Sequence, residues 1–145
     1  MITDNRILIV DDEPDLRDIL KIYLEELGYG VETAPNGQAG LERYRKQRPP
    51  IVMTDIKMPG MDGIELLQRI KEENPETEVI MITGHGDMAL AIKSLKLEAT
   101  DFITKPINDD VLEIALKRAH ERIDMRAQLK AYTENLENLV REQSA

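Results

Sequence analysis

Short runs of apolar residues alternate along this chain with longer segments in which apolar residues recur every three or four positions. A short β-branched run is typical of a buried strand, and the longer repeat is typical of a helix with one apolar face. The expected strands span residues 7–10, 31–34, 51–54, 79–83 and 101–104, and the expected helices span 14–27, 36–48, 63–73, 88–97 and 108 onward. This alternation predicts parallel strands joined by crossover helices in a doubly wound α/β fold.

The first expected helix shows its apolar face most clearly. Pro14 suits its first turn, and Gly28 suits its end. Six apolar residues follow the helical repeat between these two positions, namely Leu16, Ile19, Leu20, Tyr23, Leu24 and Leu27. We therefore expect them to form one apolar face.

The last helix continues past the point where a fifth crossover helix should end. Asn108 can cap it, and Val111, Ala115 and Ala119 are expected to cover the sheet. Beyond them the apolar residues recur at spacings of 4, 3, 4 and 3, at Met125, Leu129, Tyr132, Leu136 and Leu139. This heptad seam changes phase near Arg126 and predicts packing on another helix, either in a parallel homodimer or as a connector to a missing output domain. A helix that is simply solvated would leave these leucines without a partner.

Length and composition limit the class of protein. The 145 residues fit one core, so we expect one domain over 1–122 and a helical extension over 123–145. The absence of Cys excludes disulfides, thiolate metal sites and cysteine nucleophiles. The net charge of −9 argues against direct contact with nucleic acid. No apolar run approaches the ~20 residues that span a bilayer, and no signal peptide is evident, so we expect a cytoplasmic protein without membrane contact.

Acidic and polar residues follow the expected strands at one edge of the sheet, where doubly wound folds bind ligands. Asp11 and Asp12 follow the first strand, Asp55 the third, Thr83 ends the fourth and Lys105 follows the fifth. Two carboxylates ~5 Å apart repel by about 3 kcal/mol at an effective dielectric of ~20, so the cluster needs a cation. Its oxygen ligands suit Mg²⁺ or Mn²⁺, although an Asp pair at a helix start also acts as an ordinary cap. Together with the Lys105 ammonium and the Thr83 hydroxyl, the cluster contains the parts that phosphoryl transfer requires.

Four motifs follow one another in order along the chain: Ile7-Leu8-Ile9-Val10 with Asp11-Asp12-Glu13, Asp55-Ile56-Lys57-Met58-Pro59-Gly60-Met61-Asp62-Gly63, Thr83-Gly84, and Asp101-Phe102-Ile103-Thr104-Lys105-Pro106. With these motifs, residues 5–122 resemble the receiver domain family of two-component response regulators, the CheY-like superfamily. The resemblance implies a flavodoxin-like (βα)₅ sheet of order 2-1-3-4-5. It also implies a signalling domain, not an enzyme, that accepts a phosphoryl group from a sensor histidine kinase or phosphotransfer protein and then controls an output domain or partner.

The resemblance also implies roles for single residues. Asp55 is the implied phosphoryl acceptor. Asp12 and Asp55 are implied to ligate Mg²⁺ directly, Asp11 through water, and Lys57 through its backbone carbonyl. Lys105 is implied to pair with the phosphoryl group.

Three further implications concern residues around that site. The Lys105–Pro106 peptide bond is expected to be cis. Thr83 and Phe102 form the implied switch pair, although Phe102 also suits a plain core position. The side chains of Lys57 and His85 are expected to flank the attacking water, with an exposed loop residue as the alternative for His85.

The chain departs from the family pattern at two positions. Gly40 replaces a common Ala, which lowers helix propensity by ~1 kcal/mol. Glu98 replaces a common Gly, so we expect the preceding helix to end differently.

Two other classes of protein fit the sequence less well. A Mg²⁺-dependent phosphohydrolase would need an Asp-x-Asp nucleophile loop, but Asp55 is followed by Ile56 and Lys57. An interaction module that has lost phosphorylation would not need Asp12, Asp55, Thr83 and Lys105, which are all present.

Overall fold

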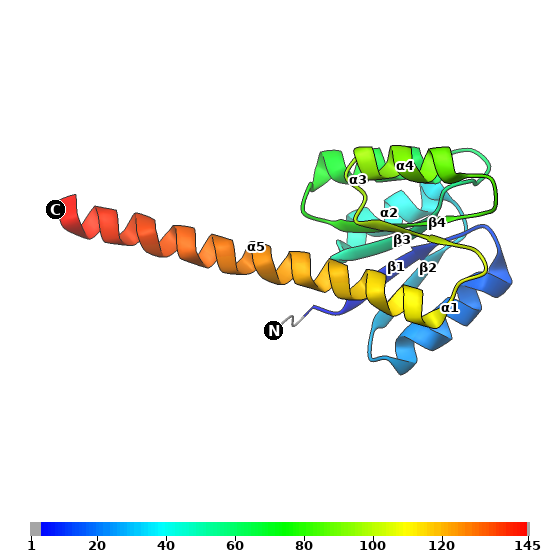
Figure 1. Ribbon diagram of the computed structural model, residues 1–145, viewed down its shortest axis with the longest axis horizontal. Helices are drawn as coiled ribbons and strands as arrows, with labels where there is room; N and C mark the ends of the chain where they lie inside the picture. The colour runs from blue at the N-terminus through cyan, green and yellow to red at the C-terminus, as the bar shows by residue number, and fades with distance from the viewer. Residues whose placement is uncertain (1–3, 145) are drawn as a thin grey trace.

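The computed structural model describes residues 4–144 and contains one five-stranded parallel sheet (Figure 1). The strands are β1 (Arg6–Val10), β2 (Gly30–Ala34), β3 (Ile51–Asp55), β4 (Glu78–Thr83) and β5 (Asp101–Thr104). The helices are α1 (Pro14–Glu26), α2 (Gly37–Gln47), α3 (Gly63–Glu73), α4 (Met88–Lys96) and α5 (Asp109–Ser144). The strand order is β2-β1-β3-β4-β5, which confirms the predicted fold class.

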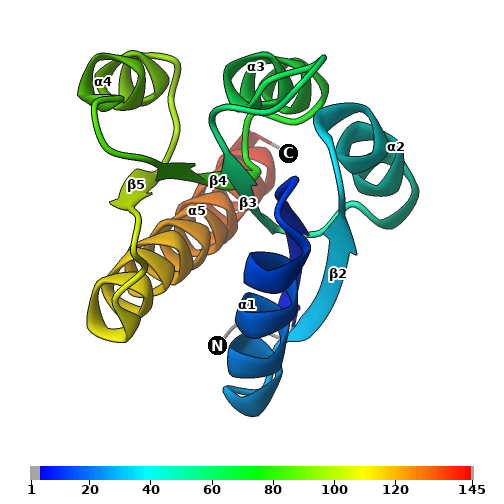
Figure 2. The same ribbon diagram turned by 90° about the vertical axis from the view of Figure 1, so that its right-hand side faces the viewer.

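Helices cover both faces of the sheet. Figure 2 shows α2, α3 and α4 on one face and α1 and α5 on the other. Each face carries its own apolar cluster, because alternate residues of the strands point to opposite sides. Leu8, Val52 and Met81 face the first group of helices, whereas Ile9 and Ile80 face the second. The three central strands are therefore buried from both sides.

Two helices bury less of their apolar stripe than the sequence predicts. In α1 only Leu20 and Leu24 are buried, Ile19 is exposed, and Leu27, which follows the last residue of the helix, is exposed too. In α5 the predicted Val111 is exposed, while Leu112, which the prediction missed, is fully buried. A straight helix crossing a sheet contacts it along a narrow line, so the margins of a wide stripe stay in solvent.

Gly40, which the sequence marked only as costing helix propensity, allows α2 to pack closely on β1. A Cβ atom at this position would lie 2.7 Å from Cγ2 of Val10. That distance is shorter than a normal carbon–carbon contact, so Ala would push α2 away from β1. The propensity cost of Gly is thus offset by close approach of the helix to the sheet.

Glu98 adopts the backbone conformation that usually selects Gly, with φ of +75°. The amide of Glu98 donates to the carbonyl of Leu95, and the amide of Ala99 donates to that of Ser94, both at 3.0 Å. This is the Schellman ending, which α1 also makes with Gly28 at φ +98°. The expectation that α4 ends differently is therefore wrong. The helix keeps the Schellman geometry, and Glu98 adopts the strained left-handed backbone conformation that Gly would adopt without strain.

Replacing Glu98 by Gly is expected to raise the free energy of unfolding by about 1 kcal/mol, because an L side chain in this region costs roughly that amount. Gly28→Ala is the matched control. An added Cβ there has no described atom within 4 Å, so only the backbone strain changes, and the variant should be destabilised by a similar amount. Urea denaturation measures both. A lower stability for Glu98→Gly would show that the conformational entropy that Gly adds to the unfolded chain outweighs the strain.

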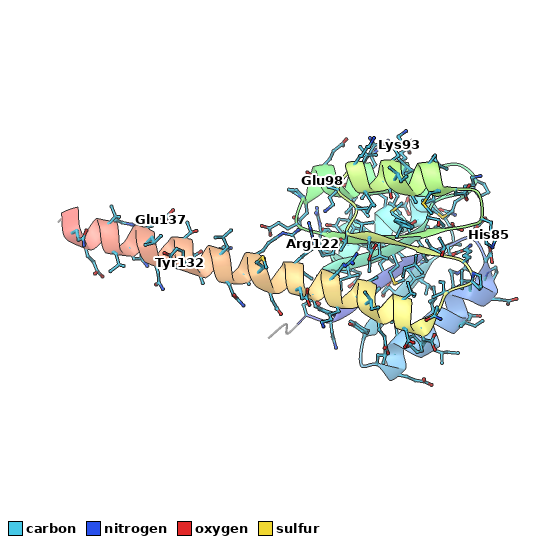
Figure 3. The ribbon with its side chains drawn as sticks, viewed as in Figure 1. His85, Lys93, Glu98, Arg122, Tyr132 and Glu137 are labelled. Carbon is cyan, nitrogen blue, oxygen red and sulfur yellow. The ribbon has the colours of Figure 1, made fainter. Side chains whose placement is uncertain are left out.

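The helix α5 continues without a break for 36 residues and leaves the domain (Figure 1). The apolar side chains of its predicted seam are all 45–69% exposed. Tyr132 projects from the part of the helix that extends beyond the domain (Figure 3).

Within residues 4–144, no helix combines the length and apolar character that crossing a membrane requires.

Candidate functional site

The parallel register brings the predicted site residues to one edge of the sheet. Val10 pairs with Thr54, so Asp11 follows β1 beside Asp55, the last residue of β3. Thr83 ends β4 and pairs with Thr104, one residue before Lys105. Residues from four segments far apart in the sequence thus meet where the four strands end.

Lys105 lies at the centre of this cluster. Its Nζ is 3.1 Å from Oδ2 of Asp55, 3.0 Å from Oε1 of Glu13 and 3.8 Å from Oδ2 of Asp11. Burial alone would lower the pKa of Lys105, but the hydrogen bonds to Glu13 and Asp55, together with the negative charges of Asp11 and Asp55, outweigh it and raise that pKa. The ammonium is therefore charged at neutral pH and is held directly against Asp55.

Glu13 was given no role in the sequence analysis, although it follows Asp11 and Asp12 in the first motif. Its side chain is exposed and reaches across the site to Lys105. The signal in the sequence is its acidity directly after the Asp pair, but only the tertiary structure shows that the loop after β1 meets the loop after β5.

The two inner carboxylates are strongly buried. Asp11 is 0% exposed and Asp55 is 6% exposed. Burial raises the pKa of Asp11 to about 6, and the nearby charge of Asp55 adds to this. Burial also raises the pKa of Asp55, against the lowering effect of Lys105. Burial and mutual repulsion therefore make it unfavourable for Asp11 and Asp55 to be ionised at the same time.

The acidic cluster has the composition of a site for a hard divalent cation. Asp11, Asp12, Glu13 and Asp55 each offer one carboxylate oxygen, and these atoms lie within 4.8 Å of one another. Oδ1 of Asp11 accepts a hydrogen bond from the amide of Glu13, but Oδ2 has no hydrogen-bond partner among the described residues. A buried acceptor without a donor is costly, and a bound cation would relieve it. The residues present thus fit Mg²⁺.

The predicted switch residues lie on neighbouring strands. Thr83 is buried at the site. Phe102 pairs in register with Met81, two residues before Thr83, and is partly buried against the cluster under α2, α3 and α4. This contact agrees with the alternative that Phe102 serves the core. The Lys105–Pro106 peptide bond is cis, as expected.

Lys57 contacts a residue that the sequence analysis did not single out. Its Nζ lies 2.8 Å from Oδ1 of Asp87, a buried residue at the start of α4. This ion pair joins the loop after β3 to the loop after β4 beside Asp55. His85 is exposed in the latter loop and lies at the rim of the domain (Figure 3).

Residues 7–117 match the family of the response regulator receiver domain. The chain belongs to this family and is a receiver domain of a two-component system. Receiver domains of this family are signalling domains that interact with histidine kinases or phosphotransfer proteins.

Relatives and solved structures agree with this assignment. The transcriptional regulatory protein FixJ of Bradyrhizobium diazoefficiens is 35% identical over 136 residues, covering 94% of this chain and 66% of FixJ. The nitrogen assimilation regulatory protein NtrX of Azorhizobium caulinodans is 41% identical over 126 residues, covering 86% of this chain but 28% of NtrX. The chain thus spans less than two thirds of each relative.

A crystal structure of a response regulator receiver domain protein from Clostridium thermocellum superposes with a TM-score of 0.80 at 35% identity, covering 83% of this chain and 97% of that one. NtrX from Brucella abortus superposes with a TM-score of 0.84 at 34% identity, covering 90% of this chain and 30% of that one.

Proposed function

We propose that this receiver domain accepts a phosphoryl group on Asp55 from a histidine kinase or a phosphotransfer protein. The observation that carries the proposal is the pair formed by Asp55 and Lys105. A nearly buried carboxylate lies 3.1 Å from an ammonium, at an edge of the sheet where Asp12 and Glu13 remain open to solvent. Phosphoryl transfer depends mainly on such positioning and charge neutralisation.

The transfer uses the side chains already gathered there. An oxygen of Asp55 attacks the phosphorus of a phosphohistidine, and the phosphorus–nitrogen bond breaks with its electron pair remaining on the imidazole. Lys105 then pairs with the phosphoryl oxygens, and the Thr83 hydroxyl donates to them. Asp12, Asp55 and the Lys57 carbonyl would hold Mg²⁺ directly and Asp11 through water, and the ion would supply further positive charge for the transfer.

We further propose that residues 1–122 form the receiver and residues 123–145 an extension that links its state to an output domain or partner. Movement of Thr83 toward the phosphoryl group, with Phe102 turning inward, is the proposed conformational switch. The exposed seam of α5 supports self-association, since it covers only about two heptads and an isolated helix of that size is marginal in water unless a partner covers it. To act on an output domain or partner, the switch must move an element that extends beyond the receiver, and α5 extends out of the domain (Figure 1).

Intact mass spectrometry after incubation with acetyl phosphate and Mg²⁺ tests the proposed function. A receiver gains one labile phosphoryl group. A phosphohydrolase would instead turn the substrate over without retaining it, and a module that has lost phosphorylation would do neither. Either of these results contradicts the proposal.

Mg²⁺ is expected to raise the melting temperature of the wild type and to have much less effect on Asp12→Ala. A ligand that binds only the native state stabilises it by about 1.4 kcal/mol at tenfold excess over Kd. Asp15→Ala is the matched control, because Asp15 is exposed on α1 and lies outside the acidic cluster. Thermal denaturation with and without Mg²⁺ measures the change in melting temperature for each protein. An equal response of the wild type and Asp12→Ala would remove Asp12 from the ligand set.

A further inference from the structure

A buried charge lies at the opposite end of β4 from the phosphorylation site. Glu78 begins this strand and is 0% exposed. A buried carboxylate is costly unless charged or hydrogen-bonding groups surround it. The proposed phosphoryl transfer does not use Glu78, so its burial needs another explanation.

Three side chains converge on Glu78, two from α5 and one from the loop before β5. The hydroxyl of Thr100 donates to Oε1 at 2.8 Å, and Nε of Arg122 donates to the same oxygen at 2.7 Å. Oε2 makes no well-directed hydrogen bond with the described residues, and the charge of Arg126 neutralises it, with Nη1 2.5 Å away. Nη1 of Arg126 also donates to the backbone carbonyl of Glu76 at 2.7 Å. The carboxylate is thus enclosed by two arginines.

Both arginines lie on α5 where it leaves the domain. Residues four apart on a helix share a face, so Arg122 and Arg126 reach the same carboxylate. Figure 3 shows Arg122 at this point of the helix. Ala119 is the last fully buried apolar residue of α5, and Ile123 still packs in part against the core. Apolar packing ends here, and the ion pairs continue the contact for one more turn.

We propose that Glu78, Arg122 and Arg126 form a clamp that holds the helical extension to the receiver as one rigid body. The direction in which α5 leaves the domain is then set by β4, the strand that also carries Thr83. Glu78 is fully buried and the side chain of Arg126 is 29% exposed, so solvent weakens this ion pair less than a surface ion pair, whereas the side chain of Arg122 is 51% exposed. This inference does not depend on phosphorylation.

Distance measurement between two nitroxide labels tests the clamp. The chain has no Cys, so Lys46→Cys on α2 and Ala131→Cys on α5 give two unique labelling sites, both exposed. Labelled chains diluted into unlabelled protein report distances within one molecule. In Glu78→Gln and in Arg126→Ala, the distribution of distances is expected to widen about twofold, because the last anchored turn of α5 is released.

Arg118→Ala is the matched control. Arg118 lies on the same helix and pairs with Asp101 at 3.0 Å, but on the surface, so its loss should leave the distribution unchanged. Arg126→Ala keeps Glu78 paired with Arg122, which preserves the fold if Glu78→Gln does not fold. A distribution in Arg126→Ala as narrow as in the wild type would overturn the proposal. Equal widening in Arg118→Ala would overturn it as well, because any lost ion pair would then suffice.

Discussion

Replacement of Asp55 by Asn is expected to abolish phosphorylation by acetyl phosphate. The amide keeps the volume of the carboxylate but removes the nucleophilic oxygen and one proposed metal ligand. The fold should persist, since Lys105 retains Glu13 as a partner. Because burial raises the pKa of Asp55, its charge opposes folding at neutral pH, and the variant should melt at a temperature at least as high as the wild type.

Intact mass spectrometry and thermal denaturation check the two parts of this prediction. Asp15→Asn is the matched control and should be phosphorylated like the wild type, because Asp15 lies outside the cluster. Full phosphorylation of Asp55→Asn at another residue would reject Asp55 as the acceptor. If Asp55→Asn loses both phosphorylation and the fold, Lys105→Ala tests the proposed chemistry instead. This variant keeps Asp55 and should be phosphorylated more slowly than the wild type.

The double variant Leu129→Lys with Leu136→Lys is expected to be monomeric under conditions in which the wild type self-associates. Both leucines are exposed, and in a parallel pair each would face its counterpart across the seam. Lysines at these positions would bring like charges together along the seam. Since the seam covers only about two heptads, we expect weak, concentration-dependent dimers of the wild type.

Analytical ultracentrifugation with and without phosphorylation measures this effect. The control is Ala131→Lys with Asn138→Lys, which adds the same charge at the same spacing but outside the seam, and it should dimerise like the wild type. Phosphorylation at Asp55 should be unchanged in both. A wild type that stays monomeric at high concentration in either state would favour a connector to a further domain over a dimerisation helix.

The sequence alone predicted every strand and helix, and it predicted β5 with the bounds that the structure has. It could do so because each element satisfies its own local periodicity, and because parallel strands end at a common edge whatever their side chains are. The positions of Asp11, Asp55, Thr83 and Lys105 follow from that rule. Their roles in phosphoryl transfer stay predictions.

Contacts between distant elements were decided by the tertiary structure. The approach of α2 to β1 makes Gly40 necessary, and the meeting of loops brings Lys57 to Asp87. The burial of Glu78 depends on where α5 crosses the base of β4, since an acidic residue at the start of a strand is ordinarily exposed. Such pairings join residues 30 to 48 positions apart in the sequence. A local sequence pattern cannot predict which distant residue will neutralise a given charge.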